Sequence, residues 1–319
     1  MMNNIYFSVV IPLYNKQESI LRAIDSVLKQ SYVYFELIII NDGSTDNSKK
    51  VIDDNVSDSR VKIFDQSNSG VSITRNNGIK KSKYNYVCLL DADDTWSPNF
   101  LNEIKKLVNQ DPNCSLYSTR YKEIYPCGKE FIGKLSLAKN HFGIVHNFYA
   151  AYARSRSLIH SSSVCINKSI MEKVSYFPEN IKLGEDIFTW LKLAENNDVS
   201  FSSTICSTVH RDAENRTNTH TSLDVLYHIK YYLSNDGLKI INKLDIKKRN
   251  QLLQFLYRNL FVNAIYSLSK KNKYVFKSYC EIIKKHNLCL FFILKGIEIL
   301  LPIKIINSLA NIRNKLQNE

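Results

Sequence analysis

Residues 5–13 read IYFSVVIPL, a run of β-branched and aromatic side chains that predicts a buried strand. The segment that follows predicts a helix, because its apolar residues share one face at helical spacing. These residues are Ile20, Leu21, Ile24, Val27 and Leu28. Further strands are expected at residues 35–40, 61–64 and 86–90, with a short helix at residues 46–56. This alternation is typical of an α/β fold with a mostly parallel sheet and helices on both faces.

Polar residues follow three of the predicted strands directly, at residues 12–15, 41–44 and 91–94. In open α/β sheets, ligands bind outside the carboxyl ends of the strands. We therefore expect these three loops to converge on one site.

The third loop, Asp91-Ala92-Asp93-Asp94, places three carboxylates directly after an apolar strand. Hard divalent cations take oxygen ligands and commonly bridge one or two carboxylates to substrate phosphates. The segment is therefore a candidate cation site. The alternative is an acidic loop or a helix-capping cluster ahead of Pro98, because Asp favours turns and helix N-termini.

Bulk composition indicates a globular protein with an anionic partner. The chain has 319 residues, 44% of them hydrophobic, which suffices for one large or two modest domains. Its formal charge of +13 indicates a nucleic acid, anionic lipid or nucleotide ligand. The seven Cys residues lack CxxC spacing, which favours reduced thiols, and the N-terminal residues lack the pattern of a signal peptide, so a cytoplasmic location is expected.

The chain beyond the first third divides into two regions. Residues 114–210 mix strand-like and helical patterns and are expected to extend the first domain. Residues 218–319 are helical and basic, with helices expected at 223–233, 247–269 and 274–285.

The segment at residues 288–309 is rich in Leu, Ile and Phe, but polar residues and a proline interrupt it. It therefore does not predict a membrane-spanning helix. An interfacial helix at an anionic membrane surface fits the pattern, while a helix packed on the first domain or on another subunit is the alternative. The interrupting residues are Lys295, Glu298, Pro302 and Lys304, and the basic flanks are Lys284, Lys285, Arg313 and Lys315.

Five short motifs together resemble one enzyme family. They are SVVIPLYN at 8–15, NDGSTD at 41–46, RNNG at 75–78, DADD at 91–94 and GED at 184–186. In this order and spacing they resemble the family-2 inverting glycosyltransferases, whose nucleotide-diphospho-sugar-binding fold is called GT-A. The resemblance implies a GT-A catalytic domain at residues 1–217. Its nucleotide-sugar half would be about 1–110 and its acceptor half about 111–217, with a helical C-terminal extension at 218–319.

The resemblance also implies a binding site for a UDP-sugar. Pro12 and Tyr14 would flank the uracil, Asp42 would accept a hydrogen bond from the ring NH, and Arg75 would lie beside the nucleotide. The residues alone also allow Tyr14 to be loop packing, Asp42 a turn residue and Arg75 a solvated helix residue. Asp46 is expected to bind a helix N-terminus.

Within the acidic segment, the resemblance implies that Asp91 contacts the ribose or positions another ligand of the site. It gives Asp93 to Mn²⁺ or Mg²⁺ bridging the diphosphate. Three roles stay open for Asp94: holding a metal-bound water, contacting the sugar hydroxyls and capping a helix. His210 stands where some relatives supply a further metal ligand, and Arg211 is an alternative phosphate contact.

Inversion at the anomeric carbon requires a base that takes the proton of the acceptor hydroxyl. The resemblance assigns this role to Asp186, which lies at a predicted helix start where backbone NH groups favour its charged form. Glu185 and Trp190 are expected to shape the acceptor site, with a core position as the alternative for Trp190.

The resemblance implies transfer of glucose from UDP-glucose, in β-1,3 linkage, to N-acetylglucosamine on undecaprenyl diphosphate. The enzyme would act in O-antigen or surface polysaccharide synthesis, peripherally at the inner face of the inner membrane. The alternatives are galactosyl or N-acetylhexosaminyl transfer in capsule or lipooligosaccharide assembly, and a non-catalytic nucleotide-sugar or RNA binding protein. No nucleic acid partner is expected, because no RNP-like or zinc signature is present.

Overall fold

The computed structural model describes residues 4–155, 157–181, 183–213, 224–300, 305–306 and 308. They fall into two compact units, one within residues 1–146 and 157–217 and the other within residues 147–156 and 218–319. Residues 147–156 lie inside the predicted first domain, yet they belong with the C-terminal helices.

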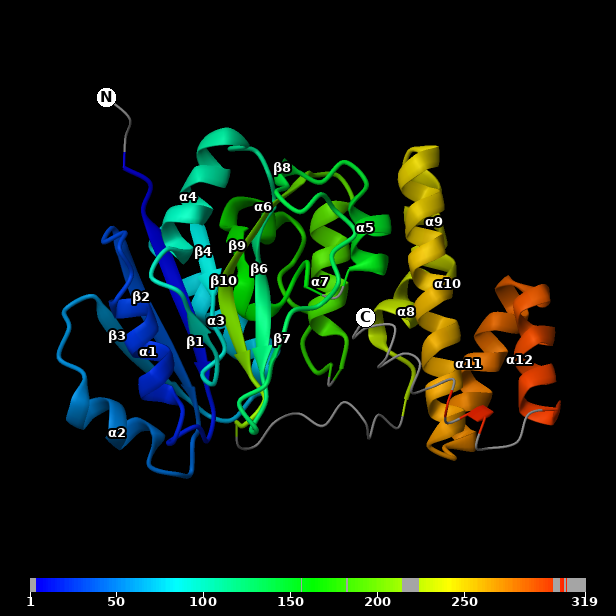
Figure 1. Ribbon diagram of the computed structural model, residues 1–319, viewed down its shortest axis with the longest axis horizontal. Coiled ribbons are helices and arrows are strands. Elements are labelled where there is room, and N and C mark those ends of the chain that lie inside the picture. The colour runs from blue at the N-terminus through cyan, green and yellow to red at the C-terminus, as the bar shows by residue number, and fades with distance from the viewer. Residues whose placement is uncertain are drawn as a thin grey trace. The chain divides into compact units, whose positions relative to one another are not determined.

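The first unit is built on one large sheet with the strand order β3-β2-β1-β4-β9-β6-β10-β5. The first four strands of this order are parallel to one another, as the sequence predicts (Figure 1). They are β1 (Phe7–Leu13), β2 (Phe35–Asp42), β3 (Val61–Gln66) and β4 (Tyr86–Leu89). The helices between and after them are α1 (Ile20–Leu28), α2 (Ser48–Asn55), α3 (Val71–Lys81) and α4 (Phe100–Gln110).

Helices cover both faces of this half of the sheet. Val9 and Ile11 of β1 share a core with apolar residues of α1 and α4 on one face. On the other face α3 approaches β1 so closely that a Cβ at Gly78 would lie 2.2 Å from Val10 Cγ1. The absence of a side chain at Gly78 therefore lets α3 pack onto the sheet, which brings Arg75 of the same helix to the carboxyl edge.

The second half of the sheet runs partly antiparallel. β9 pairs antiparallel with β4 and β6, whereas β6 pairs parallel with β10. β5 follows the acidic segment and pairs with the end of β10, so β10 returns to the site. The strands are β5 (Thr95–Trp96), β6 (Leu116–Ile124), β7 (Glu130–Phe131), β8 (Phe142–Ile144), β9 (Val164–Asn167) and β10 (Val199–His210), and the helices are η1 (Ser161–Ser163), α6 (Lys168–Lys173) and α7 (Glu185–Ala194).

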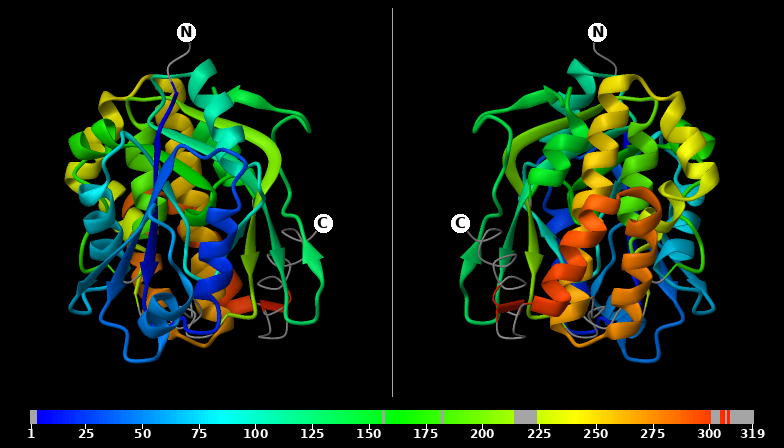
Figure 2. Two further views of the ribbon diagram at one scale, coloured as in Figure 1. Left: turned by 90° about the vertical axis from the view of Figure 1, so that its left-hand side faces the viewer. Right: turned by 90° about the vertical axis from the view of Figure 1, so that its right-hand side faces the viewer.

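The second unit is helical, which confirms the predicted helical C-terminal region. Its helices are α5 (Phe148–Arg154), α8 (Tyr227–Tyr232), α9 (Asn235–Lys243), α10 (Ile246–Ser269), α11 (Lys273–His286) and α12 (Leu288–Leu300). The last three lie side by side (Figure 2). Among the described helices, none combines the length and apolar character needed to cross a membrane. The predicted segment at 288–309 continues past Leu300 into residues that lie outside the described ones, Pro302 and Lys304 among them, as do Arg313 and Lys315.

Candidate functional site

A cavity of about 740 Å³ opens at the carboxyl ends of β1, β2 and β4. It brings together the three polar loops of the sequence and the start of α7. Its lining includes eight residues singled out from the sequence: Pro12, Tyr14, Asp42, Arg75, Asp91, Asp93, Asp94 and Glu185. Asp186, Trp190 and His210 are not among the residues that line it.

Asp42 forms one wall of the cavity through contacts with the loop that precedes α3. Its Oδ1 accepts hydrogen bonds from Ser69 N and Gln66 Nε2, both at 2.8 Å, and its Oδ2 accepts one from Gly70 N at 3.0 Å. Gly70 has φ of +87°, a left-handed conformation that favours glycine. The buried carboxylate therefore fixes the loop that faces Tyr14, whose side chain is 43% exposed.

The loop after β1 is anchored to the start of α2. Asn15 adopts a left-handed conformation with φ of +50°, and its Oδ1 accepts a hydrogen bond from Thr45 N at 2.7 Å. Asp46 Oδ1 accepts a hydrogen bond from Ser48 N at 2.9 Å, and its Oδ2 accepts one from Gln17 N at 3.1 Å. Asp46 thus binds the first turn of α2, as expected from the sequence.

The three carboxylates of the acidic segment have different partners. Asp91 Oδ1 accepts a hydrogen bond from the Arg75 guanidinium at 2.8 Å. Burial opposes the charge of Asp91, but Arg75, His160 and Lys16 together outweigh burial and lower the pKa of Asp91 below its usual value. Asp93 Oδ2 instead pairs with Lys16 Nζ at 2.9 Å.

Asp94 is buried and ties two distant segments together. Its Oδ1 accepts a hydrogen bond from the backbone of His210 at 3.0 Å, and its Oδ2 accepts one from the Ser162 hydroxyl. Burial and the charges of Asp93 and Asp91 raise the pKa of Asp94 well above its usual value. Asp94 does not cap a helix, because α4 begins only after Asn99.

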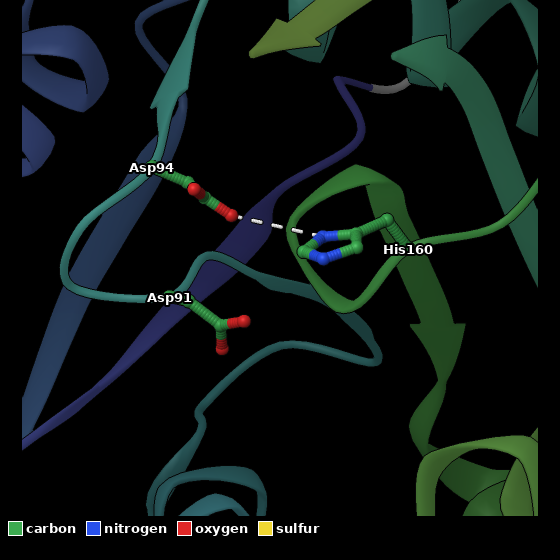
Figure 3. Close-up of side chains that lie close together, drawn as sticks. All are labelled: Asp91, Asp94 and His160. Carbon is green, nitrogen blue, oxygen red and sulfur yellow. Dashed lines mark ion pairs between the residues drawn. The ribbon is translucent and has the colours of Figure 1, made fainter. Parts of the chain in front are cut away.

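One grouping of side chains fits a divalent cation. Ligand atoms of Asp91, Asp94 and His160 all lie within 4.8 Å of one another (Figure 3). His160 Nδ1 lies 3.7 Å from Asp94 Oδ2. Carboxylate oxygens suit Mg²⁺ and Mn²⁺, and an imidazole nitrogen is a common ligand of first-row transition metals. Beside burial, the negative charges of Asp93 and Asp91 raise the pKa of Asp94, and a cation would offset this charge.

This grouping differs from the predicted metal ligands Asp93 and His210. The Asp93 carboxylate is held by Lys16. The ring of His210 lies 2.9 Å from Thr95 Oγ1 across the β5–β10 pairing. His160 takes a place in the grouping because the loop before η1 enters the site, and no motif around it in the sequence indicates this.

Arg75 joins the acidic segment to the start of α7. Besides its bond to Asp91, its NH1 lies 3.5 Å from Glu185 Oε1. Burial and the neighbouring Asp186 carboxylate raise the pKa of Glu185 to about 7, although Arg75 opposes this shift. Asp186 lies in the first turn of α7, which follows Gly184 in a left-handed conformation.

Comparison with known proteins agrees with this geometry. Residues 8–171 match the model of the family described as "Glycosyl transferase family 2". The chain belongs to glycosyl transferase family 2. The match contains the loops at residues 12–15 and 41–44, the acidic segment and His160, whereas α7 follows it.

Relatives of this family-2 chain carry glycosyltransferase names. An uncharacterized glycosyltransferase of Rickettsia bellii is 31% identical over 234 residues, which are 72% of this chain and 32% of the relative. RP339 of Rickettsia prowazekii, also named an uncharacterized glycosyltransferase, is 28% identical over 297 residues, 88% of this chain and 85% of that protein. The chain spans about a third of the length of the relatives from R. bellii, R. conorii and R. felis.

Solved structures similar to this family-2 chain show the same fold. Residues 1–349 of S. aureus TarS, in complex with UDP-GlcNAc, superpose with a TM-score of 0.67 at 18% identity, covering 98% of this chain and 93% of that one. The mannosyltransferase PcManGT from Pyrobaculum calidifontis, in complex with GDP-Man and Mn²⁺, gives 0.58 at 14% identity, covering 100% and 89%. The family-2 chain therefore has the GT-A-like α/β fold that its motifs imply.

Of the two positions left open for Trp190, the acceptor site and the core, the structure has the core position. Trp190 is 1% exposed and packs edge-on against Phe177, with ring centroids 5.5 Å apart. It lies on the face of α7 that is buried in the core, so it does not border the cavity. Glu185, one turn nearer the helix start, does line it.

The sequence reasoning missed three residues of the family-2 site. His160 joins the cation grouping, Lys16 pairs with Asp93, and Arg22 of α1 donates to the backbone oxygen of Asp93 at 3.1 Å. Lys16 directly follows the first motif, which is the one available signal for it. His160 and Arg22 carry no local signal.

Proposed function

We propose that this glycosyltransferase is an inverting, metal-dependent hexosyltransferase that uses a UDP-sugar. The observation that carries the proposal is the convergence, in one cavity, of the Asp42 wall, the acidic segment and Glu185 beside Asp186. The cavity thus has one side suited to a nucleotide, a middle suited to a metal-bound diphosphate and one side suited to an acceptor.

The donor is proposed to lie between Tyr14 and the Asp42 wall. The exposed ring of Tyr14 offers a stacking face for uracil, and Asp42 offers carboxylate oxygens for the uracil NH. The nucleotide-sugar complexes of TarS and PcManGT support a nucleotide-sugar donor of this kind. We propose UDP-glucose as the donor, with N-acetylhexosaminyl transfer as the second candidate because TarS is seen with UDP-GlcNAc.

The residues proposed to hold Mn²⁺ or Mg²⁺ are Asp91, Asp94 and His160, with Asp93 beside them. A cation bound there would offset the charge that develops on UDP as the glycosidic bond breaks. Arg75 contributes a permanent positive charge at the same place, because its guanidinium is buried against Asp91.

Asp186 is proposed to take the proton of the acceptor hydroxyl as that oxygen attacks the anomeric carbon. Asp186 lies in the first turn of α7, and the adjacent Glu185 is oriented toward the site by Arg75. Attack from the side opposite to the departing UDP inverts the configuration, which gives a β-linked product from an α-linked donor.

The acceptor is proposed to be a saccharide on a polyisoprenyl diphosphate, with N-acetylglucosamine on undecaprenyl diphosphate joined in β-1,3 linkage as the specific case. The protein would then work peripherally at the inner face of the inner membrane. Support comes from the second unit, where every exposed residue of α12 is apolar or Cys and the adjacent end of α11 is basic. The exposed residues are Leu288, Cys289, Phe292, Ile293, Ile299 and Leu300.

The direct test incubates the purified chain with Mn²⁺, each common UDP-sugar and a synthetic lipid-diphosphate N-acetylglucosamine acceptor. The expected result is transfer of one hexose with a β-anomeric product by NMR. An α-linked product would overturn the inverting mechanism. Transfer solely from a GDP- or dTDP-sugar would overturn the assignment of Asp42 to uracil.

A further inference from the structure

The ammonium of Lys16 forms an ion pair with Asp93, the residue that the family motif would assign as a metal ligand. Lys16 Nζ lies 2.9 Å from Asp93 Oδ2, and the two side chains are 12% and 16% exposed. Both residues line the cavity beside Asp91 and Asp94. The pair therefore lies in the space proposed for the donor diphosphate.

The backbone of Lys16 is fixed, whereas its side chain is a flexible stem. Lys16 N donates to Ser48 Oγ at 2.8 Å, and the preceding Asn15 is held to Thr45 in its left-handed conformation. A movement of the ammonium therefore requires only rotation of the four-carbon side chain. The ammonium can therefore change partner while the backbone of Lys16 stays in place.

The other cations at the acidic segment have different attachments. Arg75 is buried and shared between Asp91 and Glu185, and Arg22 donates to the backbone oxygen of Asp93 rather than to its carboxylate. Lys16 is thus the cation that pairs with the Asp93 side chain in the described structure. Asp93 itself lies outside the grouping of Asp91, Asp94 and His160.

We propose that Lys16 changes its ion-pair partner when the donor binds. Its ammonium neutralises Asp93 before the donor enters and binds the donor diphosphate afterwards. As the donor enters with its divalent cation, the Lys16 ammonium leaves Asp93 and pairs with a diphosphate oxygen, and Asp93 joins the cation site. The exchange follows from charge: a divalent cation and an ammonium on one carboxylate repel each other, while an ammonium binds phosphate well as a point charge. This inference rests on the proposed function, because it assumes a metal-bound diphosphate donor.

The experiment compares Lys16→Met with Lys29→Met, which removes the same charge from an exposed pair with Asp25 on α1. Binding of Mn²⁺ alone is measured by electron paramagnetic resonance, and binding of UDP at saturating Mn²⁺ by calorimetry. Lys16→Met is expected to tighten Mn²⁺ binding about 5-fold and to weaken UDP binding about 10-fold. Lys29→Met is expected to leave both unchanged.

A second substitution identifies the carboxylate involved. In the Asp93→Asn background, Lys16→Met is expected to give no gain in Mn²⁺ affinity, because the carboxylate that it releases is gone. Lys16→Gln replaces Lys16→Met in the same comparison if the first variant does not fold.

The outcomes separate this inference from the proposed function. If the unaltered chain binds Mn²⁺ and UDP but Lys16→Met leaves either affinity unchanged, or weakens Mn²⁺ binding, the exchange is overturned and the proposed function stands. If the unaltered chain binds neither Mn²⁺ nor UDP, the proposed function is overturned and the exchange with it.

Discussion

Arg75 on α3 and Asp91 after β4 form an ion pair in which Arg75 is buried and Asp91 partly buried, with the guanidinium 2.8 Å from Asp91 Oδ1. The same guanidinium reaches Glu185 at the start of α7. One side chain therefore connects the acidic segment to the motif that contains the proposed base. Since removal of one partner leaves a buried charge uncompensated, this pair contributes to both stability and site geometry.

Arg75→Gln should therefore destabilise the first unit strongly. We expect the free energy of unfolding to fall by about 3 kcal/mol in urea titrations, because Asp91 and Glu185 lose their cation. Arg60→Gln is the control, since Arg60 pairs with Asp58 at a more exposed position and should cost less than about 1 kcal/mol. Equal losses of unfolding free energy in the two variants would show that burial of Arg75 does not strengthen the contribution of its ion pair to stability.

Gly78 and Gly296 give a matched pair of helix substitutions with opposite expected signs. Gly78→Ala should lower the free energy of unfolding by about 2 kcal/mol, because its Cβ would meet Val10 Cγ1 at 2.2 Å. Gly296→Ala in α12 should raise it by about 0.5 kcal/mol, because its Cβ would meet no described atom beyond its own stretch of helix within 4 Å and alanine favours the helix. Thermal unfolding of the two variants checks this, and stabilisation by Gly78→Ala would contradict the close approach of α3 to β1.

The extent to which the sequence predicts this structure depends on the range of the interactions. The strands at 5–13 and 86–90 and the helix at 20–28 were recognised because their periodicity is local. The convergence of the three loops followed from the general rule for parallel sheets. The nucleotide and catalytic roles of the predicted residues stay predictions.

Long-range contacts account for what the sequence did not reveal. His160 reaches the acidic segment through the fold alone, and the ion pair of Lys16 with Asp93 depends on the close approach of two loops. The position of Trp190 near the GED motif leaves the acceptor site and the core open, and the turn of the helix places its side chain in the core. Residues 147–156 join the second unit although they interrupt the first.

We predict that the buried side chain of His228 in α8 makes the folded protein less stable in acid. It is fully buried, neither ring nitrogen has a hydrogen-bond partner among the described residues, and burial lowers its pKa to about 3. Because the unfolded chain binds a proton near pH 6.5 and the folded one does not, His228 lowers stability as pH falls from about 6.5 to about 3.

His228→Phe removes this dependence. The free energy of unfolding of His228→Phe minus that of the unaltered chain should rise by about 1.4 kcal/mol for each pH unit below 6.5. Urea titrations between pH 7.5 and about pH 5 measure this difference. His146→Phe, at an exposed position, is the control and should show no such growth. A pH-independent difference for His228→Phe would show that the buried ring does not resist protonation.

The exposed face of α12 is expected to bind anionic membranes. Ile299→Glu should weaken co-sedimentation with phosphatidylglycerol vesicles by about 10-fold, because it removes one inserted apolar side chain and adds a repelled charge. Ile246→Glu makes the same change at an isoleucine of α10 that is 68% exposed, against 76% for Ile299, and should have a much smaller effect. Equal effects of the two substitutions would place the membrane contact elsewhere.

The central claim is that this family-2 chain transfers a sugar with Asp186 as the base, and Asp186→Asn tests it most directly. The measurement is the single-turnover rate of hexose transfer from the UDP-sugar, with UDP affinity determined on the same preparation. We predict a rate about 10³-fold lower with UDP affinity unchanged within about 2-fold. Transfer at the unaltered rate by Asp186→Asn would contradict the account.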